Sequence, residues 1–491
     1  MKKTVLFAVD TAVLLLASAA VRALGGIFSA AGFAVHTALL LAAVIPLRAL
    51  LLLRRGGGYR LPLCLALCDT AGFVIYTAAE YAVAAFASAK GFTRDGTVHT
   101  AAVFAAATLA SVCLRLGIAA RVGSDGGIIG RRESCPDISR AVDVADLLGR
   151  EEIVLNPRAV SGYIAGETVL VTGAGGSIGG ELCRRVSELS PERLILLDIC
   201  ENGVFDIMQE LIHRFGTGFP ALTVICSVCD KSAVERVFAE YRPDVVFHAA
   251  AHKHVPFMEL SPREAVINNV FGTRNVALAA GRQGNCRMVL ISTDKAVCPA
   301  SVMGATKRLC EMLLPYCPET VYTAVRFGNV FGSSGSVVPL FERQIAAGGP
   351  VTVTDRRATR YFMTLREAVG LLLEASASVG DGKILLLDTG SPVNIGALAE
   401  RMVRRAGLTP YKDIDITEIG LRPGERLHEE MPRGEELPGA PCGGRITVLP
   451  CGRLAPDTAE AVLADLAAAC ESGTEEDVRA ALCRAVPEYK P

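Results

Sequence analysis

The hydrophobic pattern divides the chain into an apolar front and a longer mixed part. Four long apolar runs lie near the N-terminus, over residues 4–20, 33–53, 61–87 and 99–119. Each is near or above the roughly 18–20 residues that a helix needs to cross a bilayer. We therefore predict a four-helix transmembrane region over residues 1–122.

Basic residues flank these runs on one side of the predicted membrane. They precede the first run, separate the second from the third, and follow the fourth. They are Lys2, Lys3, Arg54, Arg55, Arg60, Arg121, Arg131 and Arg132. Because cytoplasmic flanks carry the excess of Lys and Arg, both termini are expected in the cytoplasm. Three further apolar runs follow the first, which favours an anchor helix over a cleaved signal peptide.

The pattern changes after a Gly- and Arg-rich linker and a helical lead-in, together residues 123–166. From residue 167, short apolar runs alternate with helical stretches, which predicts an α/β domain over residues 167–491. Six runs fit buried parallel strands: 168–171, 194–197, 222–225, 245–248, 289–292 and 323–327. The alternation indicates a Rossmann-type doubly wound parallel sheet, with a smaller C-terminal substrate-binding region.

Composition narrows the classes of function. The 491 residues carry a formal net charge of −1, which gives no support for binding nucleic acid. The 16 cysteines are scattered through apolar and loop segments, as in a reduced compartment. Cys226 and Cys229 form a lone C-x-x-C without a second pair, so no zinc site is expected.

A glycine-rich loop, Thr172–Gly179, follows the first predicted strand and opens a helix. Gly173 would permit the tight turn, Gly176 the approach of a pyrophosphate, and Gly179 close packing of helix on sheet. We expect this loop, including Ser177 and Ile178, to bind a dinucleotide.

Two acids extend the predicted cofactor site. Asp198 ends the second strand, where it can accept hydrogen bonds from ribose hydroxyls and would repel a 2′-phosphate. NAD is therefore expected rather than NADP. Asp230 follows the third strand and is a candidate contact for the adenine.

The segment Ser292–Lys307 carries candidate chemistry. A short-chain dehydrogenase usually has a Tyr four residues before a Lys on one helix face, and Lys307 would be that Lys. Met303 occupies the place of the Tyr, and a thioether carries no proton. Either the site is inactive or its acid–base chemistry has moved to Asp294 and Lys295.

Several motifs together resemble one family, the membrane-anchored nucleotide-sugar 4,6-dehydratases of bacterial polysaccharide and glycan biosynthesis. These are extended short-chain dehydrogenases. The motifs are the Gly loop, residues 248–256, 268–273 and 292–307, Arg326–Val330, residues 335–339, 359–363 and 421–425. The resemblance implies conversion of a UDP-sugar, UDP-N-acetylglucosamine above all, to a UDP-4-keto-6-deoxy sugar, with NAD regenerated in each cycle.

The same resemblance implies roles for the catalytic segment. Thr293 would hold the C4 oxygen, and Asp294 would protonate the C6 leaving group. Lys295 would remove the C5 proton, which requires a depressed pKa, expected from burial beside the cationic nicotinamide. Lys307 would bind the nicotinamide ribose, and Met303 becomes a family marker. The acceptor of the C4 hydroxyl proton stays open between Asp294 and water linked to Lys307.

Substrate contacts are expected from four further residues. Arg360 and Arg422 are candidates to clamp the diphosphate, because guanidinium pairs bidentately with phosphate oxygens. Lys253 and Asn329 are expected to line the pocket. The histidines at 248, 252 and 254 are assigned to a strand end and a loop over the cofactor, and no metal site is expected.

The chain departs from the family pattern in two places. Cys298 replaces an Asn, and only about 50 residues separate the fourth apolar run from the Gly loop, too few for the additional domain of many large members.

Two other functions stay open. A UDP-sugar 4-epimerase usually needs the missing Tyr, and an inactive NAD-binding scaffold would have no need for Asp294, Lys295 and Lys307 together.

The expected surroundings follow from the resemblance and the apolar runs. The chain is predicted to be a multi-pass protein of the bacterial inner membrane, with its catalytic domain in the cytoplasm. Expected partners are the UDP-sugar, the lipid bilayer, a second copy of the chain, and a downstream aminotransferase or glycosyltransferase.

Overall fold

The computed structural model describes residues 157–316, 321–378, 382–430, 441–442, 445–450 and 454–490. All of these belong to one compact unit of the chain, Cys135–Pro491. The predicted transmembrane region and most of the lead-in lie outside the described residues. Among the helices that are described, none is long and apolar enough to span a bilayer.

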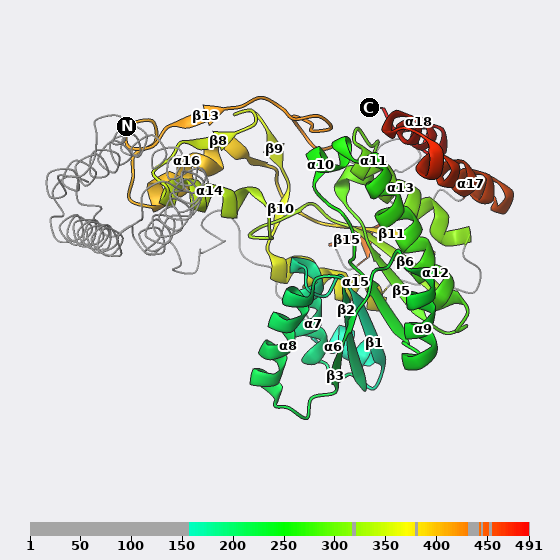
Figure 1. Cartoon of the computed structure of the whole chain (residues 1–491). Coiled ribbons are helices and arrows are strands. Elements are labelled where there is room, and N and C mark those ends of the chain that lie inside the picture. The colour runs from blue at the N-terminus through cyan, green and yellow to red at the C-terminus, as the bar shows by residue number, and fades with distance from the viewer. Residues whose placement is uncertain are drawn as a thin grey trace, which may run out of the picture. The chain divides into compact units, whose positions relative to one another are not determined.

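A parallel sheet forms the centre of this unit (Figure 1). All six predicted strands are present within one or two residues of their expected ends. They are β1 (Thr168–Thr172), β2 (Arg193–Asp198), β3 (Ala221–Ile225), β4 (Val245–His248), β5 (Arg287–Ile291) and β6 (Val321–Arg326). Their spatial order is β3-β2-β1-β4-β5-β6, so the predicted doubly wound Rossmann-type topology is confirmed.

Three more strands extend the sheet beyond β6. They are β11 (Lys383–Leu387), β15 (Ile446–Leu449) and β14 (Pro441–Cys442). β11 pairs parallel with β6, whereas β15 and β14 continue antiparallel. The sequence pattern did not predict these strands.

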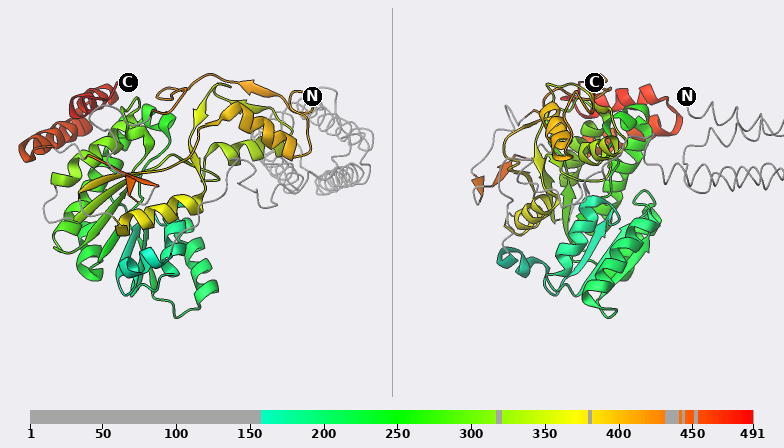
Figure 2. Two further views of the ribbon diagram at one scale, coloured as in Figure 1. Left: turned by 180° about the vertical axis from the view of Figure 1, so that it is seen from behind. Right: turned by 90° about the vertical axis from the view of Figure 1, so that its left-hand side faces the viewer.

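Helices cover both faces of the sheet (Figure 2). One layer contains α6 (Pro157–Ile164), α7 (Ser177–Ser187), α8 (Glu201–Phe215) and α15 (Leu365–Ser378). The other contains α9 (Lys231–Tyr241), α10 (Val255–Leu260), α11 (Pro262–Ala265), η1 (Val266–Phe271), α12 (Gly272–Gly281), α13 (Val302–Leu313) and η3 (Leu314–Tyr316). Each layer buries its own apolar cluster against the sheet, which explains why the strands are apolar on both faces.

A smaller region with its own apolar core follows β6, as predicted. Phe341, Val351 and Leu398 are among its buried residues. Its elements are β7 (Asn329–Val330), α14 (Val337–Ala346), β8 (Val351–Val353), β9 (Thr359–Arg360), β10 (Phe362–Met363), β12 (Val393–Asn394), α16 (Ile395–Arg405) and β13 (Ile416–Glu418). Residues 419–430 then run from β13 back toward the sheet (Figure 1).

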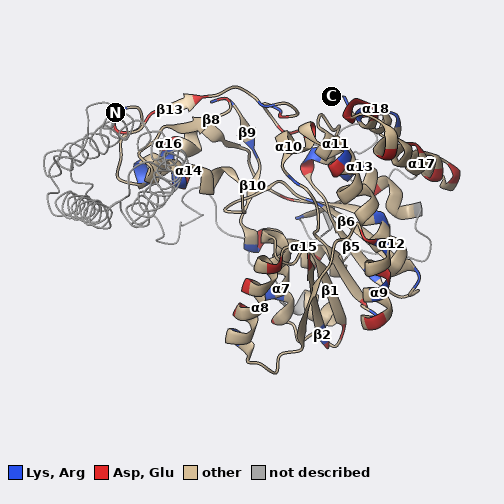
Figure 3. Ribbon diagram, in the orientation of Figure 1, with Lys and Arg blue, Asp and Glu red and all other residues tan. Residues whose placement is uncertain are grey.

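A helical hairpin ends the chain. It consists of α17 (Pro456–Ser472) and α18 (Glu475–Ala485), and α18 packs on α11 and α13. Acidic residues open α18 and Arg484 lies in its last turn, the charge order that complements a helix dipole (Figure 3). Leu466 and Leu482 are fully buried in the same apolar cluster as α13. The hairpin therefore covers the helix that carries Met303 and Lys307.

Candidate active site

The predicted site residues converge beyond the carboxyl ends of the strands. The strand order reverses between β1 and β4, because β2 and β3 lie on one side of β1 and β4 to β6 on the other. Doubly wound sheets bind ligands at this position. A cavity of about 720 Å³ lies here. Its wall includes Gly173, Gly176, Ser177, Ile178, Gly179, Lys253, Thr293, Lys295, Met303, Lys307, Asn329, Arg360, Arg422 and Glu429.

The glycine loop has the form needed to hold a dinucleotide. Gly173 has a φ of +68°, as its predicted tight turn requires. A Cβ on Gly179 would lie 2.0 Å from the carbonyl oxygen of Gly173, so only glycine allows α7 to start this close to the strand. No side chain caps the N-terminus of α7, which forms part of the cavity wall. These features fit the phosphates of NAD.

The two predicted acids lie behind this wall. Asp198 accepts hydrogen bonds from the backbone N–H groups of Gly175 and Cys200, both at 2.8 Å, and thereby holds the glycine loop. Asp230 caps α9 by accepting from the N–H of Ala233 at 2.9 Å. Their contacts with ribose and adenine stay predictions.

The triplet at the end of β5 forms a connected polar group. Residues 294–296 form a short 3-10 helix, η2 (Asp294–Ala296), capped by the Thr293 hydroxyl. That hydroxyl donates to Asp294 Oδ1 at 2.9 Å, and Lys295 Nζ donates to the same oxygen at 3.0 Å. Asp294 itself is not part of the cavity wall. It therefore reaches the cavity through the side chains of Thr293 and Lys295.

The second carboxylate oxygen of Asp294, Oδ2, has an unusual environment. Oδ2 is buried and accepts no hydrogen bond from the described residues. A buried acceptor of this kind is costly unless a partner arrives. The sequence predicts that Asp294 carries a proton during the reaction, and this role stays a prediction.

Lys295 is surrounded by three acceptors. Its Nζ lies 3.0 Å from Asp294 Oδ1, 3.0 Å from Asn329 Oδ1 and 3.1 Å from Glu429 Oε1. Burial alone would lower the pKa of Lys295, but the charges of Asp294 and Glu429 outweigh it, so the net pKa is raised. The prediction of a depressed pKa for Lys295 is therefore wrong for this arrangement, because the carboxylates of both Asp294 and Glu429 face the ammonium.

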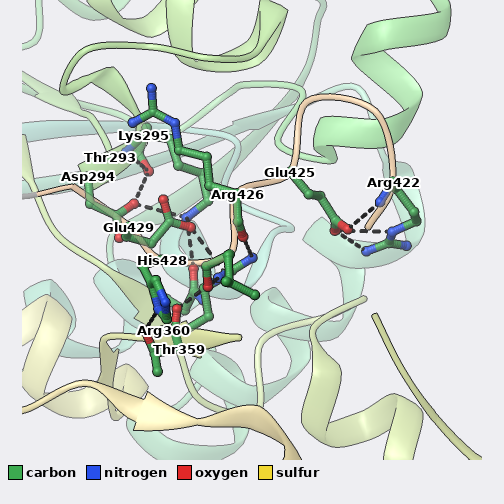
Figure 4. Close-up of polar contacts among 12 residues, drawn as sticks. Thr293, Asp294, Lys295, Thr359, Arg360, Arg422, Glu425, Arg426, His428 and Glu429 are labelled. Carbon is green, nitrogen blue, oxygen red and sulfur yellow. Dashed lines mark hydrogen bonds and ion pairs between the residues drawn. The ribbon is translucent and has the colours of Figure 1, made fainter. Parts of the chain in front are cut away.

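Glu429 is the site residue that the sequence analysis missed (Figure 4). It comes from the segment 419–430 that follows β13, and only 7% of its side chain is exposed. Its Oε1 contacts both Lys295 Nζ and, at 3.2 Å, Arg360 Nε. A signal was present, since Glu429 lies four residues beyond the 421–425 motif, but nothing in the sequence placed it beside Lys295.

Arg360 is already held by protein groups. Besides Glu429, it donates to the backbone carbonyls of Thr359, Leu427 and Arg426. A diphosphate clamp at Arg360 would have to replace some of these bonds. The guanidinium of Arg422 donates two hydrogen bonds to Glu425, and 53% of the Arg422 side chain is exposed. Arg422 can therefore turn toward a phosphate at lower cost, and both roles stay predictions.

Lys307 and Met303 reach the cavity from the first turns of α13. Ser301 caps this helix by accepting from the N–H of Gly304. Lys307 Nζ donates to the carbonyl of Ile291 at 2.9 Å, and burial lowers its pKa. Met303 is 4% exposed and provides an apolar surface where the phenol of a tyrosine was expected.

Lys253 connects two loops of the wall. Its Nζ donates to the carbonyl of Ser334 at 2.7 Å, and the N–H of Ser334 donates to Ser177 Oγ at 2.9 Å. The loop that contains Ser334 is thus joined by hydrogen bonds both to Lys253 and to the glycine loop. Burial lowers the pKa of Lys253.

The remaining motif residues have structural roles. His248 is fully buried, and its two ring nitrogens lie 2.8 Å and 2.9 Å from the hydroxyls of Thr172 and Thr273. Both nitrogens therefore have hydroxyl partners and neither points to a metal. Cys298 has a φ of +40°, a left-handed conformation that Asn tolerates better than Cys. This backbone geometry accounts for the Asn expected at this position.

The fold and the site define a Rossmann-type protein with a dinucleotide loop and a Thr-Asp-Lys group at the end of β5. Residues 169–441 match the family model described as polysaccharide biosynthesis protein, and the chain belongs to this family.

Two curated relatives and one solved structure are similar to this chain. The capsular polysaccharide biosynthesis protein CapD of Staphylococcus aureus is 48% identical over 61% of the chain and 50% of its own length. The probable polysaccharide biosynthesis protein EpsC of Bacillus subtilis is 46% identical over 66% of the chain and 55% of its own length. The X-ray structure of Pen from Bacillus thuringiensis aligns with a TM-score of 0.54 and 34% identity, covering 59% of this chain and 90% of Pen. The chain thus spans about half the length of these curated relatives.

Proposed function

We propose that the chain is an NAD-dependent nucleotide-sugar 4,6-dehydratase that acts on UDP-N-acetylglucosamine. The observation that carries this proposal is the connected group of Thr293, Asp294 and Lys295 beside the glycine loop, with Met303 in place of a tyrosine. Membership of a polysaccharide biosynthesis family supports a sugar substrate. The choice of UDP-N-acetylglucosamine rests on the resemblance of the motifs.

The site residues can account for the proton that leaves the C4 hydroxyl. When bound, NAD would take the C4 hydride and later return it to C6. The O4 proton would pass to Thr293 Oγ1 while the hydroxyl proton of Thr293 moves to Asp294 Oδ1, 2.9 Å away. Asp294 therefore becomes the neutral acid that the next step requires, and no tyrosine is needed.

Protonation of Asp294 also makes the Lys295 ammonium easier to deprotonate. Loss of the carboxylate charge at 3.0 Å removes one of the groups that raise the pKa of Lys295, so the ammonium can release its proton to solvent. The neutral amine then takes the C5 proton. Asp294 returns its proton through Thr293 to O6, and water leaves as the C6–O bond breaks. Lys295 reprotonates C5 when the hydride reaches C6 and then takes back from solvent the proton that it released earlier. The enzyme thus regains its starting charges, and the net change is loss of one water.

The decisive experiment incubates the detergent-solubilised full chain with UDP-N-acetylglucosamine and analyses the nucleotide sugars by mass spectrometry. Loss of one water supports the dehydratase. An unchanged mass with altered sugar configuration would indicate the 4-epimerase, and no conversion would support the inactive scaffold.

Two variants test the assignments. Asp294→Asn removes the proton carrier and Lys295→Ala removes the base, and general acid–base groups typically contribute about 10²–10⁴-fold. We expect turnover to fall by that order in each, while binding of NAD, measured by calorimetry, stays within about twofold. Undiminished turnover in either variant would remove that residue from the mechanism.

We also propose the setting of the reaction. The product would supply an aminotransferase or glycosyltransferase of glycan assembly at the cytoplasmic face of the bacterial inner membrane. The four apolar runs and their basic flanks support this location.

A further inference from the structure

Four charged side chains form an alternating chain through the site. Arg360 contacts Glu429 at 3.2 Å, Glu429 contacts Lys295 at 3.1 Å, and Lys295 contacts Asp294 at 3.0 Å. The mechanism above uses Lys295 and Asp294 but gives no role to the other two. Glu429 is the member at the centre, because one oxygen serves both cations.

Glu429 reaches this position from a distant part of the chain. Three polar contacts hold the segment around it. The Thr359 hydroxyl lies 2.8 Å from His428 Nδ1, and Arg360 donates to the carbonyls of Arg426 and Leu427. The side chains of Arg360 and Glu429 are 12% and 7% exposed. A buried carboxylate requires charged partners, and here it has two.

We propose that Glu429 is a positioning residue that holds the Lys295 amine beside Asp294 and Asn329 and governs when Lys295 gives up its proton. This inference deepens the proposed dehydration and rests on it for the role of Lys295. With Asp294 ionised, two carboxylates keep Lys295 as an ammonium. Once Asp294 has taken the O4 proton, only Glu429 remains, and Arg360 offsets part of its charge.

The charged groups around Lys295 are few among the described residues. Asp294 faces it from η2, Glu429 from the segment 419–430, and Arg360 from β9 behind Glu429, while Asn329 adds a neutral acceptor from β7. Burial lowers the pKa of Lys295, both carboxylates raise it, and Arg360 lowers it. Removing the charge of Glu429 must therefore make the neutral amine available at lower pH.

The test compares Glu429→Gln with Glu430→Gln in the full chain. Glu430 is the next residue and pairs with Arg426 at 3.1 Å, so it controls for loss of a carboxylate in the same segment. An opposite charge within 4–6 Å shifts a pKa by about 1–3 units. We expect the rising limb of kcat against pH to move about one unit lower in Glu429→Gln, with KM within threefold. Glu430→Gln and Glu429→Asp should keep the limb within about 0.3 units of the wild type.

A purely structural role gives a different result. Glu429→Gln would then lower kcat by one factor at every pH, or lower only the thermal midpoint, and either result overturns the proposal. A second readout does not depend on turnover: with ¹³Cε-labelled lysine, the Lys295 resonance, assigned by its absence in Lys295→Arg, should titrate at lower pH in Glu429→Gln. A wild type that leaves UDP-N-acetylglucosamine unchanged refutes the proposed function, whereas an unmoved Lys295 titration refutes the role of Glu429.

Discussion

At the scale of single residues, burial fixes His248 in its neutral form. The ring lies between two threonine hydroxyls with no exposed surface. Burial, aided by the charge of Lys307, lowers its pKa to about 3. Because the unfolded chain has the ordinary value near 6.5, the unfolded state binds this proton first as the pH falls.

His248 should therefore make stability depend on pH. The loss of unfolding free energy that His248 causes is absent above about pH 6.5. It grows by about 1.4 kcal/mol per pH unit below that, until the folded-state pKa near 3 is reached. We expect the unfolding free energy, measured by urea denaturation at pH 7.5, 6.5 and 5.5, to fall more steeply in the wild type than in His248→Gln. The control, His213→Gln, removes an exposed histidine in the last turn of α8 and should keep the wild-type slope. Equal slopes in wild type and His248→Gln would contradict the prediction.

At the scale of elements, a buried ion pair joins α13, the helix that carries Met303 and Lys307, to the sheet. Arg326 of β6 donates to both oxygens of Glu311 of α13, at 2.7 Å and 2.6 Å, and neither side chain is exposed. The Ser292 hydroxyl, next to Thr293, donates to the same carboxylate at 2.6 Å. Burial alone would raise the pKa of Glu311, but Arg326 and its other partners hold it below its usual value. The ion pair thus ties α13 to β6, and the Ser292 bond ties it to the end of β5.

Breaking this pair should be costly. Arg326→Met leaves a buried carboxylate without its main partner, and we expect a loss of about 3–5 kcal/mol in unfolding free energy. Arg484→Met is the matched control, because it removes an arginine that pairs bidentately with Asp465 between α17 and α18 but is 60% exposed. That change should cost about 1 kcal/mol or less. Urea denaturation compares the unfolding free energies of the two variants. Similar losses would mean that the buried ion pair stabilises the fold no more than the exposed one.

Elements differ in how far the sequence predicts them. β1 to β6 were predicted because each is a short apolar run bounded by turns, and burial on both faces leaves a clear pattern. β15 was missed because this short segment becomes a strand through its antiparallel pairing with the distant β11, where Ile446 and Leu449 lie opposite β11 residues. The glycine loop was predictable because close packing there demands glycine.

Among the site residues, too, the sequence predicts the local contacts and misses the distant one. Thr293, Asp294 and Lys295 are neighbours in sequence, so their contact follows from one local turn. Glu429 joins them only through the path of the segment 419–430, and local pattern holds no information on that path. The direction of the Lys295 pKa shift was mispredicted in part for this reason, because the charges of Asp294 and the distant Glu429 together outweigh the effect of burial.

At the scale of the whole molecule, the chain joins a strongly apolar N-terminal sequence to a sequence of mixed polarity. Residues 1–122 carry four apolar runs, while the unit Cys135–Pro491 buries its apolar residues in three cores around and beside the sheet. If the apolar runs anchor the chain, membrane attachment should depend on them alone. The C-terminal unit should then fold without them, because its cores are formed from its own residues.

This separation can be tested by deleting residues 1–134. We expect the full chain to sediment with membranes, resist carbonate extraction and dissolve in detergent, since each run is long enough to span a bilayer. The Cys135–Pro491 chain should stay in the supernatant after ultracentrifugation. Its urea midpoint and its calorimetric affinity for NAD should match those of the detergent-solubilised full chain, which controls for misfolding. Recovery of the full chain in the supernatant would contradict membrane attachment. Sedimentation of a folded Cys135–Pro491 chain with membranes would place the attachment elsewhere than in the apolar runs.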